Sequence, residues 1–183
     1  MEHVKFSFSH VGVFVYDLDR MTRFYERVLG LVLTDRGLLP GRELAFLSGD
    51  PREHHQVVFA TGRTGKLDDR VINQISFRVG SLEDLRTVYR TVVADPEASD
   101  LRGVNHGNAW TLYFRDPEKN RIEAFTDSPW YIAQPVADPL DLSKPAADIE
   151  AQTEQLCRAD PSFMPVEVWR RQLAARLEYA RHG

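Results

Sequence analysis

Three polar side chains lie on strand-like segments that are otherwise apolar: His10, Gln74 and Glu123. An imidazole nitrogen, an amide oxygen and a carboxylate can together bind a divalent metal and leave coordination positions open for substrate and oxygen. A carboxylate in an apolar strand is costly to bury without a partner, and a metal cation is one such partner. If the chain brings these three side chains together, the residues predict a metal site.

The clearest local pattern is a strand-turn-strand segment that contains Glu123. Two strand-like runs, 109–114 and 121–126, flank the sequence from Asp116 to Asn120, where Pro, Asp and Asn favour a turn. Side chains alternate along a strand, so Glu123 shares a face with its neighbours at positions 121 and 125. Ile122 and Ala124 occupy the other face, which we expect to be buried.

The segments before this hairpin predict a β-α-β-β-β order. A strand is expected within 6–16, and Asp17 and Gly30 are expected to begin and end a helix. Three further strands are expected, with a break at Gly37 and Pro40-Gly41 and another at Gly49-Asp50-Pro51: Leu31–Thr34, Glu43–Leu47 and Gln56–Ala60.

The pattern then repeats at an offset of about 64 residues. A strand at 71–79 is followed by a helix that Ser81 caps, and the offset superposes His10 on Gln74 and Leu18 on Leu82. Self-similarity in both residues and element order predicts a duplicated unit. His10, Gln74 and Glu123 each lie opposite the helix-facing aliphatic residues of their strands, so we expect all three to point into one cleft between the modules.

Composition excludes several classes of function. The 183 residues are 43% hydrophobic and 27% charged, as in a soluble globular protein, and the net charge of -4 argues against nucleic-acid binding. No apolar run reaches the length of about 20 residues that a membrane helix needs. The single cysteine, Cys157, excludes an internal disulfide and fits a reducing compartment. With no apolar leader after Met1, we expect a cytoplasmic protein.

The sequence resembles the vicinal oxygen chelate superfamily, which includes glyoxalase I, bleomycin-resistance proteins and type I extradiol dioxygenases. Within it, the pattern is similar to the catechol 2,3-dioxygenase signature: the matching positions are His106, Leu112-Tyr113, Asp116-Pro117 and Glu123, while Lys119 replaces the usual Gly. The run from His55 to Phe59 also resembles that family, and the resemblance covers about residues 6–132.

The resemblance implies roles for six residues. His10 and Glu123 match the first and last iron ligands, and Gln74 stands where the family has the middle histidine ligand. His55 matches the acid–base histidine, while His106 and Tyr113 match the pair that hydrogen-bonds the substrate. The implied function is an extradiol ring-cleavage dioxygenase that uses Fe2+, with Mn2+ or another divalent metal as alternatives, and a small aromatic diol and O2 as substrates.

Two other functions stay open at this point. One is a different metal-dependent isomerase or lyase of the same superfamily. Glyoxalase I would need a fourth ligand where this chain has Val57, which favours three ligands. The other is a metal-free protein that binds a small aromatic molecule, for which the amide at Gln74 is the main indication.

The predicted fold is α+β: two tandem βαβββ modules form a half-open, barrel-like sheet around a metal cleft, followed by a C-terminal helical extension. The expected domains are residues 1–135, with modules at about 5–62 and 70–128, and residues 136–183. Helices are expected at 146–158 and 167–181. A short helix pair is not stable alone, so it must pack on the modules, cover the cleft or contact another subunit. We expect a homo-oligomer, with the extension as a contact.

Overall fold

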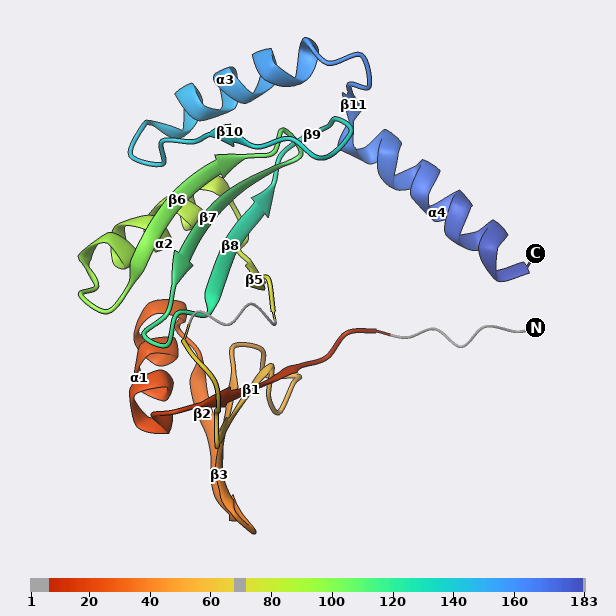
Figure 1. Ribbon diagram of the computed structural model, residues 1–183. Helices are drawn as coiled ribbons and strands as arrows, with labels where there is room; N and C mark the ends of the chain where they lie inside the picture. Colours follow the sequence, from red (N-terminus) through yellow and green to blue (C-terminus); the bar gives the residue numbers. More distant parts are fainter. Residues whose placement is uncertain (1–6, 68–71, 183) are drawn as a thin grey trace.

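The computed structural model describes residues 7–67 and 72–182, which form two βαβββ modules and a C-terminal extension (Figure 1). Module one contains β1 (Val11–Val15), α1 (Leu18–Leu29), β2 (Val32–Leu39), β3 (Arg42–Ser48) and β4 (Val57–Thr61). Module two contains β5 (Ile75–Arg78), α2 (Leu82–Ala94), β6 (Ser99–Asn105), β7 (Ala109–Arg115) and β8 (Arg121–Asp127).

The two sheets have the same strand order, which confirms the predicted duplication. Module one has the order β1-β4-β3-β2, and module two has β5-β8-β7-β6 with the short strand β10 (Asp138–Pro139) beside β6. In each module the first strand pairs in parallel with the last strand, and the other pairs are antiparallel. The sheets do not close into a barrel, so the fold is the half-open α+β arrangement that the sequence predicted.

The predicted helix boundaries are confirmed by their caps. The Asp17 side chain accepts a hydrogen bond from the Arg20 N–H, and the Ser81 side chain accepts one from the Asp84 N–H. Gly30 ends α1 in the left-handed conformation, with φ of 66°, which a residue with a Cβ adopts at a cost. These local signals are strong because each satisfies backbone groups that the helix itself leaves unpaired.

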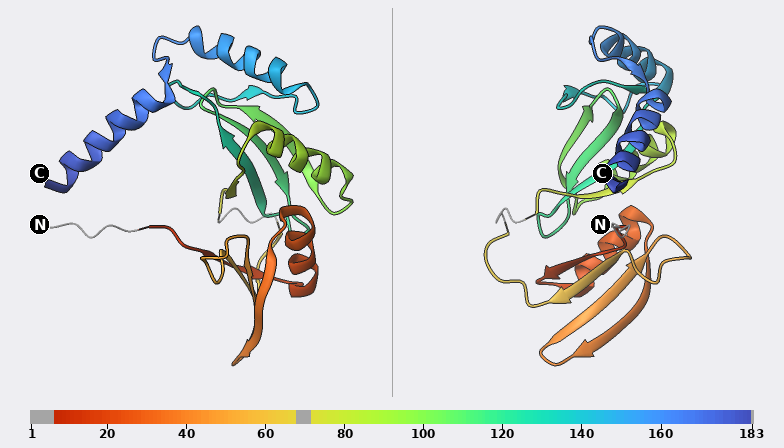
Figure 2. Two further views of the ribbon diagram at one scale, coloured as in Figure 1. Left: turned by 180° about the vertical axis from the view of Figure 1, so that it is seen from behind. Right: turned by 90° about the vertical axis from the view of Figure 1, so that its right-hand side faces the viewer.

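Each sheet buries one face against a helix and leaves the other face open. Helix α1 packs on β3 and β4, helix α2 packs on β7 and β8, and the two helices contact each other (Figure 2). Alternate residues of the strands, such as Val13, Phe59, Leu112 and Ile122, form the core with the helices. We call the opposite side the open face; it carries the other set of alternate residues in both modules.

Three strand predictions need correction. β1 begins at Val11, the first residue that pairs with β4, and not at the start of the expected run 6–16. Gly37 does not break a strand: β2 runs through it, pairs it with Leu44 and turns only at Pro40-Gly41. The predicted βαβββ order requires a strand where β6 lies, but its residues were not assigned, since a sequence with Asp100 and Gly103 has a weak strand pattern.

The extension packs on module two through α3 (Ala146–Arg158), whose bounds match the prediction. Thr153 of α3 accepts hydrogen bonds from Asn105 Nδ2 at 2.9 Å and from Trp110 Nε1 at 2.8 Å. Helix α4 (Val166–His182) follows the short pair of β9 (Trp130–Tyr131) and β11 (Met164–Pro165) and extends away from both modules (Figure 1). The extension is therefore in part a packing element of module two.

The β7–β8 turn joins the two modules. Buried Glu118 accepts backbone hydrogen bonds from Tyr16 and Asp17 at 2.8 Å each, and its other oxygen lies 3.2 Å from Arg63 Nη1. Asp116 is fully buried, and its carboxylate accepts hydrogen bonds from Asn120 at 2.8 Å and from Tyr25 of α1 at 3.2 Å. The turn that the sequence predicted as a connector is also a contact between modules.

Burial raises the pKa of Asp116 from its ordinary value of 3.8 to about 6, against the opposing effect of its hydrogen bonds. The unfolded chain therefore loses this proton at lower pH than the folded chain does. We expect the free energy of unfolding of the wild type, relative to Asp116→Asn, to fall as pH rises from about 4 to 6. Urea unfolding of both proteins across this range measures it; parallel pH profiles would contradict it.

No helix among the described residues is long and apolar enough to span a bilayer.

Candidate functional site

Four side chains form a row across the open face of module two. Glu123 of β8 is the register partner of Tyr113 on β7 and of Ser76 on β5, and Tyr113 is the partner of Arg102 on β6. Register partners share a face, so the pairing of the strands alone aligns these side chains. Gln74 precedes β5 on the same alternation as Ser76 and joins the group.

Glu123 is a nearly buried carboxylate that neutral groups surround. Its Oε2 accepts a hydrogen bond from Gln74 Nε2 at 2.7 Å and a short one from the Ser76 hydroxyl, and the Tyr113 hydroxyl also donates to it. Among the described residues, no Arg, Lys or His forms an ion pair with Glu123. A nearly buried carboxylate whose hydrogen-bond donors are all neutral is a favourable place for a cation.

Tyr113 links Glu123 to His106. The Tyr113 hydroxyl lies 3.3 Å from His106 Nε2, and His106 Nδ1 lies 2.5 Å from the carbonyl oxygen of Val136. A carbonyl only accepts, so Nδ1 donates to it, and the single Tyr113 proton goes to Glu123, which leaves Nε2 of the neutral ring as an open acceptor. Burial, with a smaller contribution from the hydrogen bond to Glu123, raises the pKa of Tyr113 to about 12. Tyr113 is therefore a neutral hydrogen-bond donor at neutral pH.

Module one holds a second cluster, of histidines, next to its open face. The His10 and His55 rings are 4.4 Å apart, and Phe46 lies 5.3 Å from His55 between ring centroids. His54 connects His55, at 2.8 Å between the two Nδ1 atoms, to Asp35, at 2.7 Å from Nε2. Desolvation, followed by the neighbouring His10 and His54, lowers the pKa of His55. His55 is thus held as a neutral imidazole that can accept a proton.

The expected convergence of His10, Gln74 and Glu123 does not occur within this chain. Gln74 and Glu123 are in contact. His10 instead contacts Ser9 and His55, and it forms no hydrogen bond or ion pair with Gln74 or Glu123. In the described part of the chain, no group of three or more His, Cys, Asp or Glu residues is arranged to hold a metal. Strand alternation correctly placed Gln74 and Glu123 on one face, but β1, which follows His10, and β5 are edge strands of separate sheets.

A family model described as the Glyoxalase/Bleomycin resistance protein/Dioxygenase superfamily matches residues 7–124. The chain belongs to this superfamily. The match covers module one and module two as far as the middle of β8, and it includes both Glu123 and the histidine cluster. A search of curated proteins finds no match.

Solved structures of the superfamily share the fold at low sequence identity. A glyoxylase/bleomycin resistance protein/dioxygenase domain from Frankia sp. EAN1pec has a TM-score of 0.59 at 22% identity, covering 68% of this chain and 100% of that one. The fosfomycin resistance protein FosX from Listeria monocytogenes, solved with Mn(II) and sulfate, has a TM-score of 0.54 at 16% identity, covering 68% and 95%. FosX from Mesorhizobium loti has 0.52 at 24% identity, covering 66% and 91%.

Sequence reasoning missed two site residues of this superfamily member. Ser76 donates to Glu123, and it could have been found because it shares the strand alternation of Gln74. Thr111 lies on the same face as Tyr113, and its buried hydroxyl has no hydrogen-bond partner among the described residues. The Ser76 hydroxyl adds a polar group to a surface that can bind a polar ligand, whereas the Thr111 hydroxyl lies buried on the same side of β7.

Proposed function

We propose that the chain is an extradiol ring-cleavage dioxygenase that acts on a small aromatic diol with O2 and depends on a divalent metal. The observation that carries this proposal is the buried Glu123 carboxylate, which has only neutral donors around it and adjoins the Tyr113–His106 pair. That group places a cation-binding carboxylate beside two side chains that can hydrogen-bond the oxygens of a diol. The spacing of His106, Tyr113 and Glu123 in the sequence supports the same activity.

The residues fit a metal in part. Glu123 supplies a carboxylate oxygen, and Gln74 would supply its amide oxygen after a half turn of the amide, which now directs Nε2 to Glu123. Fe2+ accepts such oxygen ligands together with imidazole, and so does Mn(II), the metal with which FosX from Listeria monocytogenes was solved. When bound, the metal would hold the diol and O2 side by side and draw charge from the diol.

The third ligand, His10, would come from a second copy of the chain. Within one chain His10 remains with His55 in module one. Module one exposes large apolar side chains, including 86% of Phe8 ahead of β1 and 63% of Val32 on β2. A homo-oligomer that covers this surface would bury it and would deliver His10 and His55 to the Glu123 group of the partner.

The other site residues differ in whether they donate or accept a proton. With its raised pKa, Tyr113 donates a hydrogen bond to a diol oxygen rather than removing its proton. His106 is oriented by the Val136 carbonyl and offers Nε2 as an acceptor for a diol hydroxyl. His55, with its lowered pKa, is neutral and can accept a proton during ring cleavage.

Metal content and catechol turnover test the proposal. Protein purified without chelator is loaded with Fe2+ under anaerobic conditions, and a panel of catechols is then added with O2. About one iron per active site and a yellow ring-cleavage product would support a dioxygenase. Tight metal binding without turnover would favour a metal-dependent isomerase or lyase.

A metal-free protein that binds a small aromatic molecule is the second candidate. It is favoured by the hydrogen bond from Gln74 to Glu123, which satisfies the carboxylate without a metal. Failure to bind metal after loading, together with binding of aromatic diols to chelator-treated protein, would support it. Since the one cysteine, Cys157, is buried and fits a reducing environment, we propose the cytoplasm as the location in either case.

Replacing Gln74 by His is expected to raise the affinity for Fe2+ by at least about tenfold, or about 1.4 kcal/mol, because imidazole is a better donor than an amide. Gln74→Ala serves as the matched control and is expected to weaken binding. Anaerobic Fe2+ titration of the three proteins measures the effect. Equal affinities would show that residue 74 does not contact the metal.

A further inference from the structure

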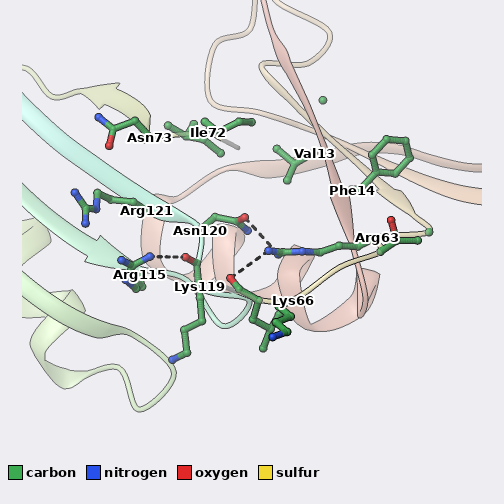
Figure 3. A pocket seen from close by; sticks show the side chains of 15 residues that line it. Val13, Phe14, Arg63, Lys66, Ile72, Asn73, Arg115, Lys119, Asn120 and Arg121 are labelled. Carbon is green, nitrogen blue, oxygen red and sulfur yellow. Dashed lines mark hydrogen bonds between the residues drawn. The ribbon is translucent and has the colours of Figure 1, made fainter. Parts of the chain in front are cut away.

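A cavity of about 950 Å³ lies between the two modules and borders the Glu123 group, since Asn73 in its lining donates a hydrogen bond to Gln74 at 3.2 Å. Its size is in the range of small-ligand sites. One side is formed by Gly12 and Phe14 of β1, and the other by the β7–β8 hairpin around Arg115 and Arg121 (Figure 3). None of the six proposed site residues lines it.

The described lining is basic although the whole chain carries a net charge of -4. Five Arg and Lys side chains line the cavity, and no Asp or Glu does so within the part of the chain that the structure describes: Arg63, Lys66, Arg115, Lys119 and Arg121. Clustered positive charge around a cavity attracts small anions.

The hydrogen bonds and ion pairs that these cations already form indicate which of them a ligand would use. Arg63 is paired with Glu118 and belongs to the contact between the modules. Arg115 is paired with Asp100 at 3.0 Å and donates to the carbonyl oxygen of Lys119 at 2.8 Å, while the Lys119 ammonium bonds, among the described residues, only the neutral hydroxyl of Ser99. Arg121, in contrast, has no hydrogen bond or ion pair to any described residue.

Arg115 and Arg121 are register partners on adjacent antiparallel strands. Like charges directly opposite each other in a sheet are unfavourable, with about 5 Å between their Cβ atoms. Both side chains line the same cavity, so an anion placed between them would remove the repulsion and supply the partner that Arg121 lacks among the described residues. A planar carboxylate matches the paired N–H groups of a guanidinium.

The rest of the lining is apolar. Phe14 and Ile72 expose about half of their surface, and Val13, Leu67 and Ile75 also line the cavity. Gly12 borders empty space, because a Cβ placed there would meet no atom within 4 Å. A larger residue at this position would therefore extend into the cavity. The cavity thus combines a basic wall with an apolar wall. The relative position of the two modules sets the distance between these walls.

We propose that this inter-module cavity binds a small organic carboxylate with an apolar body, the carboxylate between Arg121 and Arg115 and the body against Phe14. The site adjoins the proposed metal site through Asn73 but shares none of its six residues, and it requires no metal. A ligand bound at this junction would contact both modules and hold them together.

Calorimetric titration of chelator-treated protein at constant ionic strength tests this proposal. Benzoate is the probe, benzamide is its neutral match, and inorganic phosphate is an anion without an apolar body. We expect benzoate to bind with one site per chain, and benzamide and phosphate to bind at least about tenfold more weakly. Equal binding of benzamide would overturn the role of the charge, and equal binding of phosphate would overturn the role of the apolar wall.

Two substitutions test the location. Arg121→Gln is expected to weaken benzoate binding at least about tenfold without lowering the melting temperature, because it also removes the repulsion from Arg115. Gly12→Val is expected to block the cavity while keeping the fold, since valine suits a strand and has room there. Arg23→Gln changes the net charge equally on the exposed side of α1 and should bind like wild type. Unchanged binding in the first two variants, or absent binding in wild type, would overturn the site.

Discussion

Glu123→Ala is expected to lower the affinity for Fe2+ by more than about 100-fold, beyond the 10- to 100-fold loss typical when a supporting residue is removed. Glu123 is the only carboxylate in the row of side chains on module two, so no neighbouring group can replace its charge. Ring cleavage should be lost with the metal. Anaerobic Fe2+ titration and catechol turnover measure the two effects.

The fold should survive this substitution. The groups that lose an acceptor, Gln74, Ser76 and Tyr113, are polar side chains at an open face and can bond to water. Glu123→Gln keeps the volume and removes only the charge, so it is the matched control for packing. Wild-type affinity for Fe2+ in Glu123→Ala would refute the assignment of the metal ligand.

A second readout needs no metal. The hydrogen bond to Glu123 and the charge of Glu123 contribute to the raised pKa of Tyr113, although burial contributes most. In Glu123→Gln the tyrosine should therefore titrate at lower pH than in wild type, toward its ordinary value of 10. Ultraviolet absorbance of tyrosinate, compared with Tyr113→Phe to identify the signal, measures the change.

The sequence predicted the modules because their signals are local or repeated. Caps at Asp17 and Ser81 satisfy nearby backbone groups, and the offset of about 64 residues appears directly in the chain. The structure has the same element order in both modules. By contrast, β6 is stabilised by pairing with β7 and β10, which a local pattern with Asp100 and Gly103 does not reveal.

The sequence predicted which strand face carries the candidate site residues, but it did not predict how close these residues lie to one another. Alternation correctly assigned Gln74 and Glu123 to one face, and strand pairing brings them into contact. Whether His10 joins them depends on how two separate sheets lie relative to each other. That arrangement is set by buried contacts such as those of Glu118 and Asp116, which are about 100 residues from their partners in the chain and leave no periodic signal.

Glu118→Ala is expected to have the largest effect on stability, a loss of about 3–5 kcal/mol in the free energy of unfolding. Glu118 is 3% exposed, and its removal leaves the backbone N–H groups of Tyr16 and Asp17 without their acceptor. It also leaves the guanidinium of Arg63 nearly buried without a counter-charge. Removing one partner of a buried ion pair costs more free energy of unfolding than the intact pair contributes, since the remaining charge stays desolvated.

Glu97→Ala is the matched control, because Glu97 also joins the modules by ion pairs. It lies beyond α2 and contacts Arg20 and Arg27 of α1 at 2.7 and 2.8 Å, but these partners are exposed to solvent. An exposed pair contributes about 0–1 kcal/mol, so this variant should unfold near wild type. Urea unfolding compares the two, and equal losses would contradict the role of burial.

The unfolding curves also report on the coupling between modules. If the Glu118 contact holds the modules in one cooperative unit, its removal should broaden the transition or divide it in two, because each module keeps its own helix and sheet. Glu118→Gln keeps an oxygen for the two N–H groups and loses only the charge, so its loss should fall between the other variants. A single sharp transition in Glu118→Ala, as stable as wild type, would mean that other contacts join the modules.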